Sequence, residues 1–450
     1  MDERTHHMVT SAAAPLLLKM ATPNMIAFFI QSSVSIAEVW IIGQLGTGAL
    51  ASIALAFPLL MLIQTMSGGA VGGAVTSSIA RALGAGDRDR AQTLIWHGFA
   101  VAAIGTMLFL ILFLIGGRSL ITFLGGSGDI LEQAVDYCLI IFGGGLFIWL
   151  VAVVGSVFRG MGDMKLPAIL MTAGAFIQVP LTATLVLGLF GAPQMGIVGA
   201  AISAVVSGFL ISSIMLIILA RVGRVIQLDI RYLSFSRALF KDIFKVAVPA
   251  SMSPIITILI ILSLTAMVAT YGEAALAGYG IGSRIEFLLI PLVFGIGAAM
   301  TSLVGLSIGA GNIDRAEHIG WTGGIFAAGL TGVVGLMLAL FPEIWIYAFT
   351  KDPATFEAAR DYIRIVGPFF AFQGLGLSLY FASQGAGTLR WPVTAIFVRL
   401  GLAVGGGWAL AFWLELGLQG VFIASAGAMT AFGIIIAVSL KLGAWRGQTN

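Results

Sequence analysis

The stretch Gly84-Ala-Gly-Asp-Arg-Asp-Arg-Ala-Gln92 recurs further along the chain as Gly309-Ala-Gly-Asn-Ile-Asp-Arg-Ala-Glu317, at a shift of 225 positions (309 − 84). Three other pairs share this register to within one position: Asp136-Tyr137 with Asp361-Tyr362, Arg159-Gly-Met-Gly-Asp-Met-Lys-Leu-Pro167 with Gln384-Gly-Ala-Gly-Thr-Leu-Arg-Trp-Pro392, and Pro23 with Pro249. Four anchors in one register indicate an internal duplication. The chain is therefore expected to fold as two homologous halves.

The composition places these halves in a membrane. Of the 450 residues, 59% are hydrophobic and only 10% are charged, whereas soluble domains are about a quarter charged. Long stretches contain no Asp, Glu, Lys or Arg, among them residues 91–117, 166–220 and 246–272. A spanning helix needs about 20 apolar residues, so the longest of these stretches holds two spans.

Apolar runs and their Gly, Pro and charged breaks predict twelve transmembrane helices in an all-α fold. The predicted spans are 15–43, 49–80, 92–117, 131–157, 166–190, 196–220, 243–270, 275–308, 319–342, 357–383, 391–414 and 418–441. We expect an N-terminal lobe over 1–220, a cytoplasmic inter-lobe loop over 221–242 and a C-terminal lobe over 243–450. The start of the chain lacks a basic region and a cleavage site, so the first span is expected to be retained.

Basic residues predict the orientation, because loops rich in Lys and Arg stay on the cytoplasmic side. With the N-terminus inside, that side collects Arg81, Arg88, Arg90, Arg159, Lys165, the central loop, Arg315, Arg390, Lys441 and Arg446. Both termini are predicted to be cytoplasmic, in a multi-pass protein of the plasma or inner membrane.

An even number of spans in each half gives both halves the same orientation. Their pseudo-two-fold axis should then run along the membrane normal, and transporters of this design hold the substrate between the two lobes. We expect a central cavity that opens alternately to each side.

Glu38 is the leading candidate for a functional residue. It lies inside the first span, and the apolar Leu264 occupies the equivalent position of the second half. A carboxylate within a span costs about 2.5–3.5 kcal/mol, so it should have a compensating role, either by exchanging a proton or by holding Na⁺. The alternative is that Glu38 reaches the outer interface near the helix end and is simply solvated.

Three polar side chains share a helix face with Glu38 at a 3.6-residue period: Asn24, Gln31 and Ser35. Pro23, on the same helix, removes a backbone hydrogen bond and permits a kink. Bending there could couple the ionisation of Glu38 to the shape of the cavity, although a static packing kink explains the proline equally well.

A second acid, Glu286, lies in the eighth span two residues after Arg284, a spacing that does not favour a pair on one helix face. Together with Asn24, these residues are candidates for the substrate cavity. Glu286 facing that cavity would suit a cationic substrate, and a structural ion pair between helices is the alternative.

Several kinds of chemistry have no support in the sequence. The single Cys138 and the four scattered histidines predict neither a disulfide nor a metal site. No Gly-x-x-x-x-Gly-Lys-[Ser/Thr] loop occurs, so an ion gradient is the expected source of energy. We expect no enzymatic activity, no cofactor and no nucleic-acid partner, and a monomer in the lipid bilayer.

The chain resembles the multidrug and toxic compound extrusion family of twelve-helix antiporters. The resemblance rests on the order and spacing of Pro23, Gln31, Glu38 with Gly43-Gln-Leu-Gly46, Arg81-Ala-Leu-Gly-Ala-Gly86, Arg159-Gly-Met-Gly-Asp163, Gly196-Ile-Val-Gly-Ala-Ala201, Ala277-Gly-Tyr-Gly-Ile281, Arg284, Glu286 and Gly309-Ala-Gly-Asn-Ile-Asp-Arg-Ala316. It extends from Pro23 to about residue 440.

This resemblance implies that the first-helix acid binds the coupling H⁺ or Na⁺, a role that falls on Glu38, with Tyr137 in the same network. The chain departs from many prokaryotic members in having Glu rather than Asp at this position. It also has Gln178 and Thr182 where they have Asn and Asp. Fewer anionic oxygens favour H⁺ over Na⁺.

The sequence therefore predicts a secondary antiporter that exports amphipathic, cationic organic compounds in exchange for H⁺ or Na⁺. The first alternative is a flippase for a lipid-linked sugar or another lipid precursor. A more distant alternative is an ion channel or membrane-embedded enzyme, for which neither a filter motif nor a catalytic cluster is visible.

Overall fold

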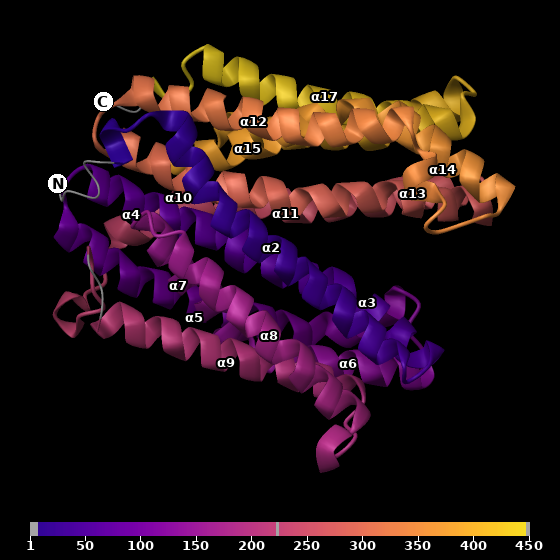
Figure 1. The fold of residues 1–450 in the computed structure, drawn as a ribbon, viewed down its shortest axis with the longest axis horizontal. Helices are drawn as coiled ribbons and strands as arrows, with labels where there is room; N and C mark the ends of the chain where they lie inside the picture. Colours follow the sequence, from indigo (N-terminus) through magenta and orange to yellow (C-terminus); the bar gives the residue numbers. More distant parts are fainter. Residues whose placement is uncertain (1–7, 222–224, 447–450) are drawn as a thin grey trace. The chain divides into compact units, whose positions relative to one another are not determined.

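The computed structural model describes residues 8–221 and 225–446, and its secondary structure is helical throughout (Figure 1). The helices before the central linker are α2 (Ala13–Gly43), α3 (Thr47–Gln64), the π-helix η1 (Thr65–Val71), α4 (Gly72–Gly84), α5 (Arg88–Phe123), α6 (Gly128–Gly143), α7 (Gly145–Gly160), α8 (Lys165–Leu187), the 3₁₀ turn η2 (Leu189–Gly191) and α9 (Ile197–Arg221). The linker contains one 3₁₀ turn, η3 (Ile230–Tyr232).

The later helices follow the linker. They are α10 (Arg237–Ala269), α11 (Glu273–Gly309), α12 (Ile313–Leu340), the short α13 (Glu343–Ile346), α14 (Pro353–Val366), η4 (Gly367–Phe369), α15 (Phe370–Ala386), α16 (Arg390–Leu400), the π-helices η5 (Gly401–Gly406) and η6 (Ala409–Trp413), and α17 (Gly417–Lys441). Among the described residues, eleven helical stretches are long and apolar enough to cross a membrane, and α6 with α7 forms a twelfth, bent one. The prediction of an all-α membrane protein with twelve spans is confirmed.

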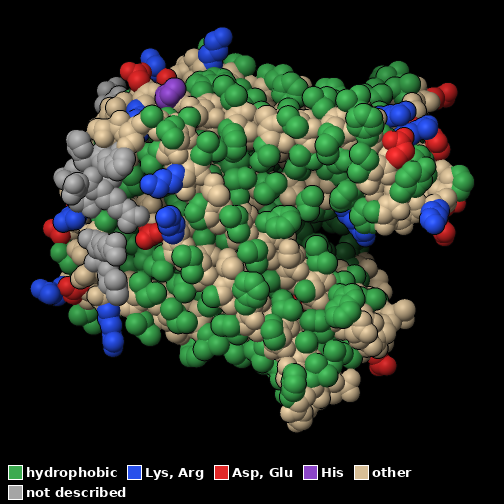
Figure 2. All heavy atoms as spheres, viewed as in Figure 1, with side chains coloured by type: hydrophobic (Ala, Val, Ile, Leu, Met, Phe, Trp, Pro, Cys, Tyr) green, Lys and Arg blue, Asp and Glu red, His purple; other side chains and the backbone are tan. Residues whose placement is uncertain are grey.

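The side chains on the surface agree with burial in lipid. Figure 2 shows hydrophobic side chains over the middle of the helices, while charged side chains gather toward their ends. Large apolar residues such as Ile36, Trp40 and Ile115 are 70%, 68% and 79% exposed. In water such a surface would drive aggregation, and in a bilayer it faces acyl chains.

The fourth span is predicted as a continuous helix over 131–157, but the structure divides it. Helices α6 and α7 meet at Gly144 with a bend of 49°. A Cβ atom at Gly144 would lie 2.5 Å from both terminal methyl groups of Val205 on α9. The glycine therefore permits close packing of α9 at the bend.

The internal repeat persists in atomic detail. The hydroxyl of Thr76 donates to the carbonyl oxygen of Ser156 at 3.0 Å, and Thr301, 225 positions later, donates to the carbonyl oxygen of Phe381 at 2.9 Å. The side chains of Asp87 and Asn312, also 225 apart, accept from the third following backbone N–H at 2.9 and 3.0 Å. The matching segments thus form the same helix contacts and the same helix caps.

The described residues form two compact units, which differ from the predicted lobes in two places. Of the described residues, the first unit contains 8–9, 26–221 and 225–247, and the second contains 10–25 and 248–446. The linker and the start of α10 therefore belong to the first unit rather than forming a separate loop, and the start of α2 belongs to the second. Pro23 and Pro249 lie within two residues of the places where α2 and α10 pass from one unit to the other.

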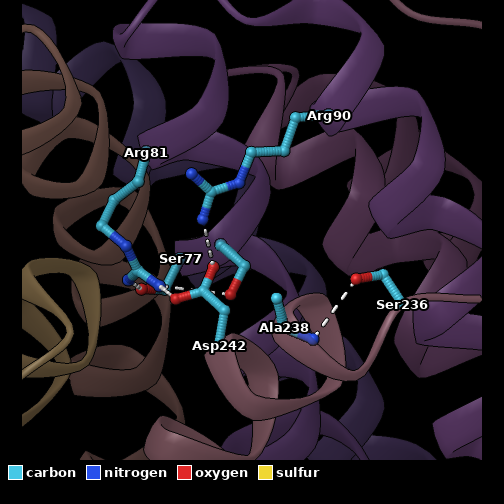
Figure 3. Close-up of polar contacts among 7 residues, drawn as sticks. Ser77, Arg81, Arg90, Ser236, Ala238 and Asp242 are labelled. Atoms are coloured by element: carbon cyan, nitrogen blue, oxygen red, sulfur yellow. Dashed lines mark hydrogen bonds and ion pairs between the residues drawn. The ribbon is translucent and has the colours of Figure 1, made fainter.

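Specific contacts hold the start of each of these two helices in the unit to which it belongs. In the first unit, Asp242 on α10 binds Arg81 at 2.8 Å and Arg90 at 3.1 Å (Figure 3). In the second unit, Arg315 donates to the backbone oxygen of Ser11 at 2.6 Å, just before α2. Arg90 and Arg315 are repeat equivalents, so each unit uses the same position to hold the beginning of a first helix.

Candidate functional site

Glu38 is the sole acid of α2, and its carboxylate points toward α8 of the first unit. The side-chain amide of Gln178 donates to Glu38 Oε1 at 2.9 Å. Residue 38 is half-buried and lies five residues before the end of the helix, or about 7.5 Å along its axis. The carboxylate therefore has a protein partner, in contrast to the simply solvated side chain of the alternative interpretation.

The other residues predicted around Glu38 lie on three helices of the same unit. Tyr137 on α6 is buried and interacts electrostatically with Glu38. Thr182, one turn after Gln178 on α8, has its hydroxyl oxygen 2.6 Å from that of Ser203 on α9. Because Ser203 donates its own proton to the carbonyl oxygen of Ala200, Thr182 is the donor in this pair.

The polar stripe on α2 does not converge on Glu38. Within the described part of the chain, no hydrogen bond joins Gln31 or Ser35 to the carboxylate, and both residues are half-buried. Asn24 is fully buried and belongs to the second unit, because α2 changes unit after Met25. The polar residues of α2 thus lie in different units, with Asn24 in the second unit and the others in the first.

In the second unit, Glu286 on α11 accepts a hydrogen bond from the hydroxyl of Tyr362 on α14. Arg399 on α16 acts electrostatically on Glu286, and its guanidinium lies 5.5 Å from the ring centre of Phe432. Tyr279 packs edge-on against Tyr362 with ring centres 5.4 Å apart. The carboxylate is therefore enclosed by aromatic side chains and one arginine.

Arg284 is oriented differently. Its guanidinium lies 5.4 Å from the ring centre of Phe349, and no ion pair with Glu286 occurs in the described residues. Arg284 and Glu286 therefore contact different side chains. Arg284 contacts Phe349 and Glu286 contacts Tyr362, so these two residues do not share a partner.

Glu286 lines a small pocket within the second unit. Its lining includes Thr331, Phe370 and Gln373, and the side-chain oxygen of Gln373 is buried without a hydrogen-bond partner. No group of three His, Cys, Asp or Glu side chains that could hold a metal ion occurs among the described residues.

Sequence reasoning missed Tyr362, Arg399 and Ser203 as members of these networks. Tyr362 carried a usable signal, since the shift of 225 maps Tyr137 onto it. Tyr362 donates a hydrogen bond to Glu286, whereas Tyr137 is buried in the first unit and Glu38 accepts from Gln178. Ser203 and Arg399 become visible only when α8 packs on α9 and α16 packs beside α11.

The fold agrees with a family-level comparison. The sequence model of the MatE family matches residues 23–185 and 249–408. The chain belongs to the MatE family. The two matches begin at Pro23 and Pro249, so the family pattern covers each half of the repeat separately.

Individual relatives of this MatE chain have names that refer to transport. It is 27% identical over 408 residues to a probable multidrug resistance protein NorM of Thermotoga maritima, covering 90% of this chain and 88% of the relative. It is also 27% identical to an FAD transporter of Shewanella oneidensis, covering 88% and 86%. A crystal structure of MATE in complex with MaL6 has the same fold, with a TM-score of 0.91, 24% identity and full coverage of both chains.

Proposed function

We propose that this MatE protein is a secondary antiporter that exports amphipathic organic cations in exchange for an inward-moving ion at Glu38. The observation that carries the proposal is the pairing of Glu38 with Gln178 between two membrane-spanning helices. A carboxylate at such a place is costly, and a role in ion movement compensates for the cost. The multidrug resistance proteins among the relatives support the choice of substrate class.

The proton is the ion that suits this site best. Sodium requires several oxygen ligands, but the hydrogen-bond partner of Glu38 among the described residues is the amide N–H of Gln178, which is a donor. The hydroxyl of Thr182 is engaged with Ser203 instead. A single carboxylate is sufficient to carry a proton, whereas it is a poor site for a hydrated monovalent cation.

Protonation would change the contact between α2 and α8. The ionised carboxylate accepts from Gln178, whereas a protonated carboxyl group also presents a donor. The amide of Gln178 can accommodate this by presenting its carbonyl oxygen. We propose that this rearrangement alters the packing of α2 and lowers the affinity for the exported compound, so that the proton and the substrate compete.

The direct test uses purified protein in liposomes loaded with a fluorescent organic cation. We expect an imposed pH gradient to drive transport and an imposed Na⁺ gradient to have no effect. Glu38→Gln should reduce the driven rate at least ten-fold, because it removes the ionisable group and keeps the shape. Ser33→Ala, on the same helix at an exposed position, is the matched control and should retain transport.

The outcomes separate the substrate from the coupling ion. Undiminished transport by Glu38→Gln would refute coupling at this residue, and transport driven by Na⁺ alone would refute the proton. Because one relative is an FAD transporter, FAD should be tested beside the cation. Movement of FAD but not of the cation would replace the proposed substrate class, and movement of a lipid-linked sugar alone would favour a flippase.

The proposed direction requires the linker and both termini to lie on the cytoplasmic side of the cell membrane. Arg88, Lys165 and Arg390, at the ends of spans, follow the distribution that keeps basic loops inside. A membrane-impermeant thiol reagent should therefore fail to label Ala85→Cys in intact cells.

A further inference from the structure

The linker and the start of α10 expose apolar and basic side chains side by side. Ile230, Leu233 and Phe235 are 73%, 45% and 60% exposed. Three exposed basic residues on α10 lie close by in the sequence: Arg237, Lys241 and Lys245. We call the six residues together the basic linker surface. Neither ion coupling nor substrate export explains why these side chains are exposed together.

Several hydrogen bonds hold the linker against α5. Trp96 Nε1 donates to the carbonyl oxygen of Asp229 at 3.1 Å, and the Tyr232 hydroxyl donates to Asp89 at 2.9 Å. The bond to Asp89 raises the pKa of Tyr232, so its hydroxyl remains a donor. Buried His97 accepts from the backbone N–H of Ser236 at 2.9 Å through Nε2.

These contacts set the depth of the linker. Residues 91–117 of α5 contain no charge, and 27 helical residues measure about 40 Å against a hydrocarbon core of about 30 Å. A centred helix therefore extends about 5 Å beyond the core at each end. Trp96 and His97 lie six and seven residues after Arg90, at the edge of the hydrocarbon, and the linker that touches them lies at the same level.

An aromatic series connects the linker to the basic face of α10. Phe235 stacks on Phe240 with ring centres 5.9 Å apart, and Phe240 stacks on Phe244 at 6.1 Å. Phe244 is partly exposed beside Lys241 and Lys245. Apolar and basic side chains thus form one continuous strip, as on interfacial membrane segments.

The positive charge of this strip is not offset locally. Arg237, Lys241 and Lys245 are spaced four residues apart and share a helix face, and none has an ion pair in the described part of the chain. The neighbouring acid, Asp242, is engaged by Arg81 and Arg90 (Figure 3). Three exposed cations therefore remain available for an external anion.

We propose that the basic linker surface is a binding surface for acidic phospholipids of the adjacent leaflet, with the apolar side chains inserted among the acyl chains and Arg237, Lys241 and Lys245 at the phosphates. This role does not depend on the exported compound or on the coupling ion. Each basic residue beside acidic headgroups should strengthen the association about five-fold.

Brominated lipids provide the test, since they quench a fluorophore only at close range. The full-length Cys138→Ala protein carries a bimane label at Leu233→Cys in vesicles of phosphatidylcholine with one third phosphatidylglycerol. We expect strong quenching by lipids brominated near the headgroup end of the acyl chains, and at least two-fold more when the bromines are on phosphatidylglycerol. The same label at Ala85→Cys, in the exposed turn before α5, should be quenched weakly.

Charge substitutions test the headgroup contacts. The preference for phosphatidylglycerol should be abolished in the triple variant Arg237→Gln/Lys241→Gln/Lys245→Gln. The control is a second triple variant, Lys165→Gln/Arg390→Gln/Lys441→Gln, which removes the same charge elsewhere and should preserve the preference. A label at 233 that is no more quenched than the label at 85 would overturn the membrane contact. Equal quenching by both lipids in the unsubstituted surface would overturn recognition of acidic headgroups.

If the triple variant does not fold, the number of phosphatidylglycerol molecules retained by the wild-type protein in native mass spectrometry gives a second measurement. We expect the protein to retain phosphatidylglycerol in preference to phosphatidylcholine. This preference should be lost in salt of about 1 M, where the Debye length falls to about 3 Å. Equal retention of the two lipids would contradict the proposal.

Discussion

The hydrogen bond from Tyr362 to Glu286 is the feature of the second unit with the clearest energetic consequence. Tyr362→Phe would leave a buried carboxylate without its donor, at a cost of about 1.5–3 kcal/mol in the free energy of unfolding. The combination with Glu286→Leu, which removes the acceptor, should cost less than the sum of the two single substitutions, because each removes the same contact. Thermal unfolding of the three variants in detergent measures this coupling, and strict additivity would contradict the contact.

The sequence alone indicated a functional role only for residues that differ chemically from the rest of their helix. Glu38 stood out because α2 has no other acid, and the structure gives it a partner on α8. The family resemblance supplied Gln178, whose position alone carries no signal. Nothing in the spacing of Thr182 indicates that its hydroxyl turns to Ser203 on α9, because that choice depends on how two helices pack.

At the scale of elements, glycines on α12 should differ sharply in their tolerance of a methyl group. A Cβ at Gly335 would lie 2.1 Å from the backbone oxygen of Gly367, while a Cβ at Gly329 meets nothing within 4 Å. Gly335→Ala should therefore destabilise the protein by at least about 1–3 kcal/mol. Gly329→Ala should be neutral or stabilising by up to about 1 kcal/mol, since alanine favours the helix.

Thermal unfolding of the two alanine variants is the measurement. They have the same substitution on the same helix, so propensity cancels in the comparison. Equal unfolding temperatures would show that α12 does not approach Gly367 as closely as described.

The attachment of α10 to the first unit depends on Asp242. The side chains of Arg81 and Asp242 are 14% and 18% exposed, so Asp242→Ala would remove charged hydrogen bonds from a largely buried pair. We expect a loss of about 1.5–3 kcal/mol and faster hydrogen exchange over residues 237–247. Asp314→Ala is the control, because Asp314 is 88% exposed in its pair with Arg446 and should cost at most about 1 kcal/mol.

Slow exchange over 237–247 in Asp242→Ala would mean that other contacts hold the start of α10. The sequence predicted a polar loop to 242 and a span from 243, whereas the helix already begins at Arg237. It gave no indication that Asp242 meets two arginines on α4 and α5, because those residues are more than 150 positions away.

For the whole molecule, the duplication and the apolar runs were sufficient to predict twelve spans in two halves. The bend at Gly144 was not predictable from hydropathy, since Gly143-Gly-Gly145 reads equally as a flexible or a close-packed site. The exchange of the first turns of α2 and α10 between the compact units was also hidden. Their membership is decided by contacts such as Arg315 with Ser11, which lie far apart in sequence.

The central claim is that one carboxylate, Glu38, exchanges a proton against an exported organic cation. The most direct measurement is proton release from purified protein in weakly buffered detergent solution when the cation is added, followed with a pH-sensitive dye. The account predicts release of up to one proton per bound cation by the wild type and none by Glu38→Gln, provided that the variant still binds the cation. The same proton release from both proteins would contradict coupling at Glu38.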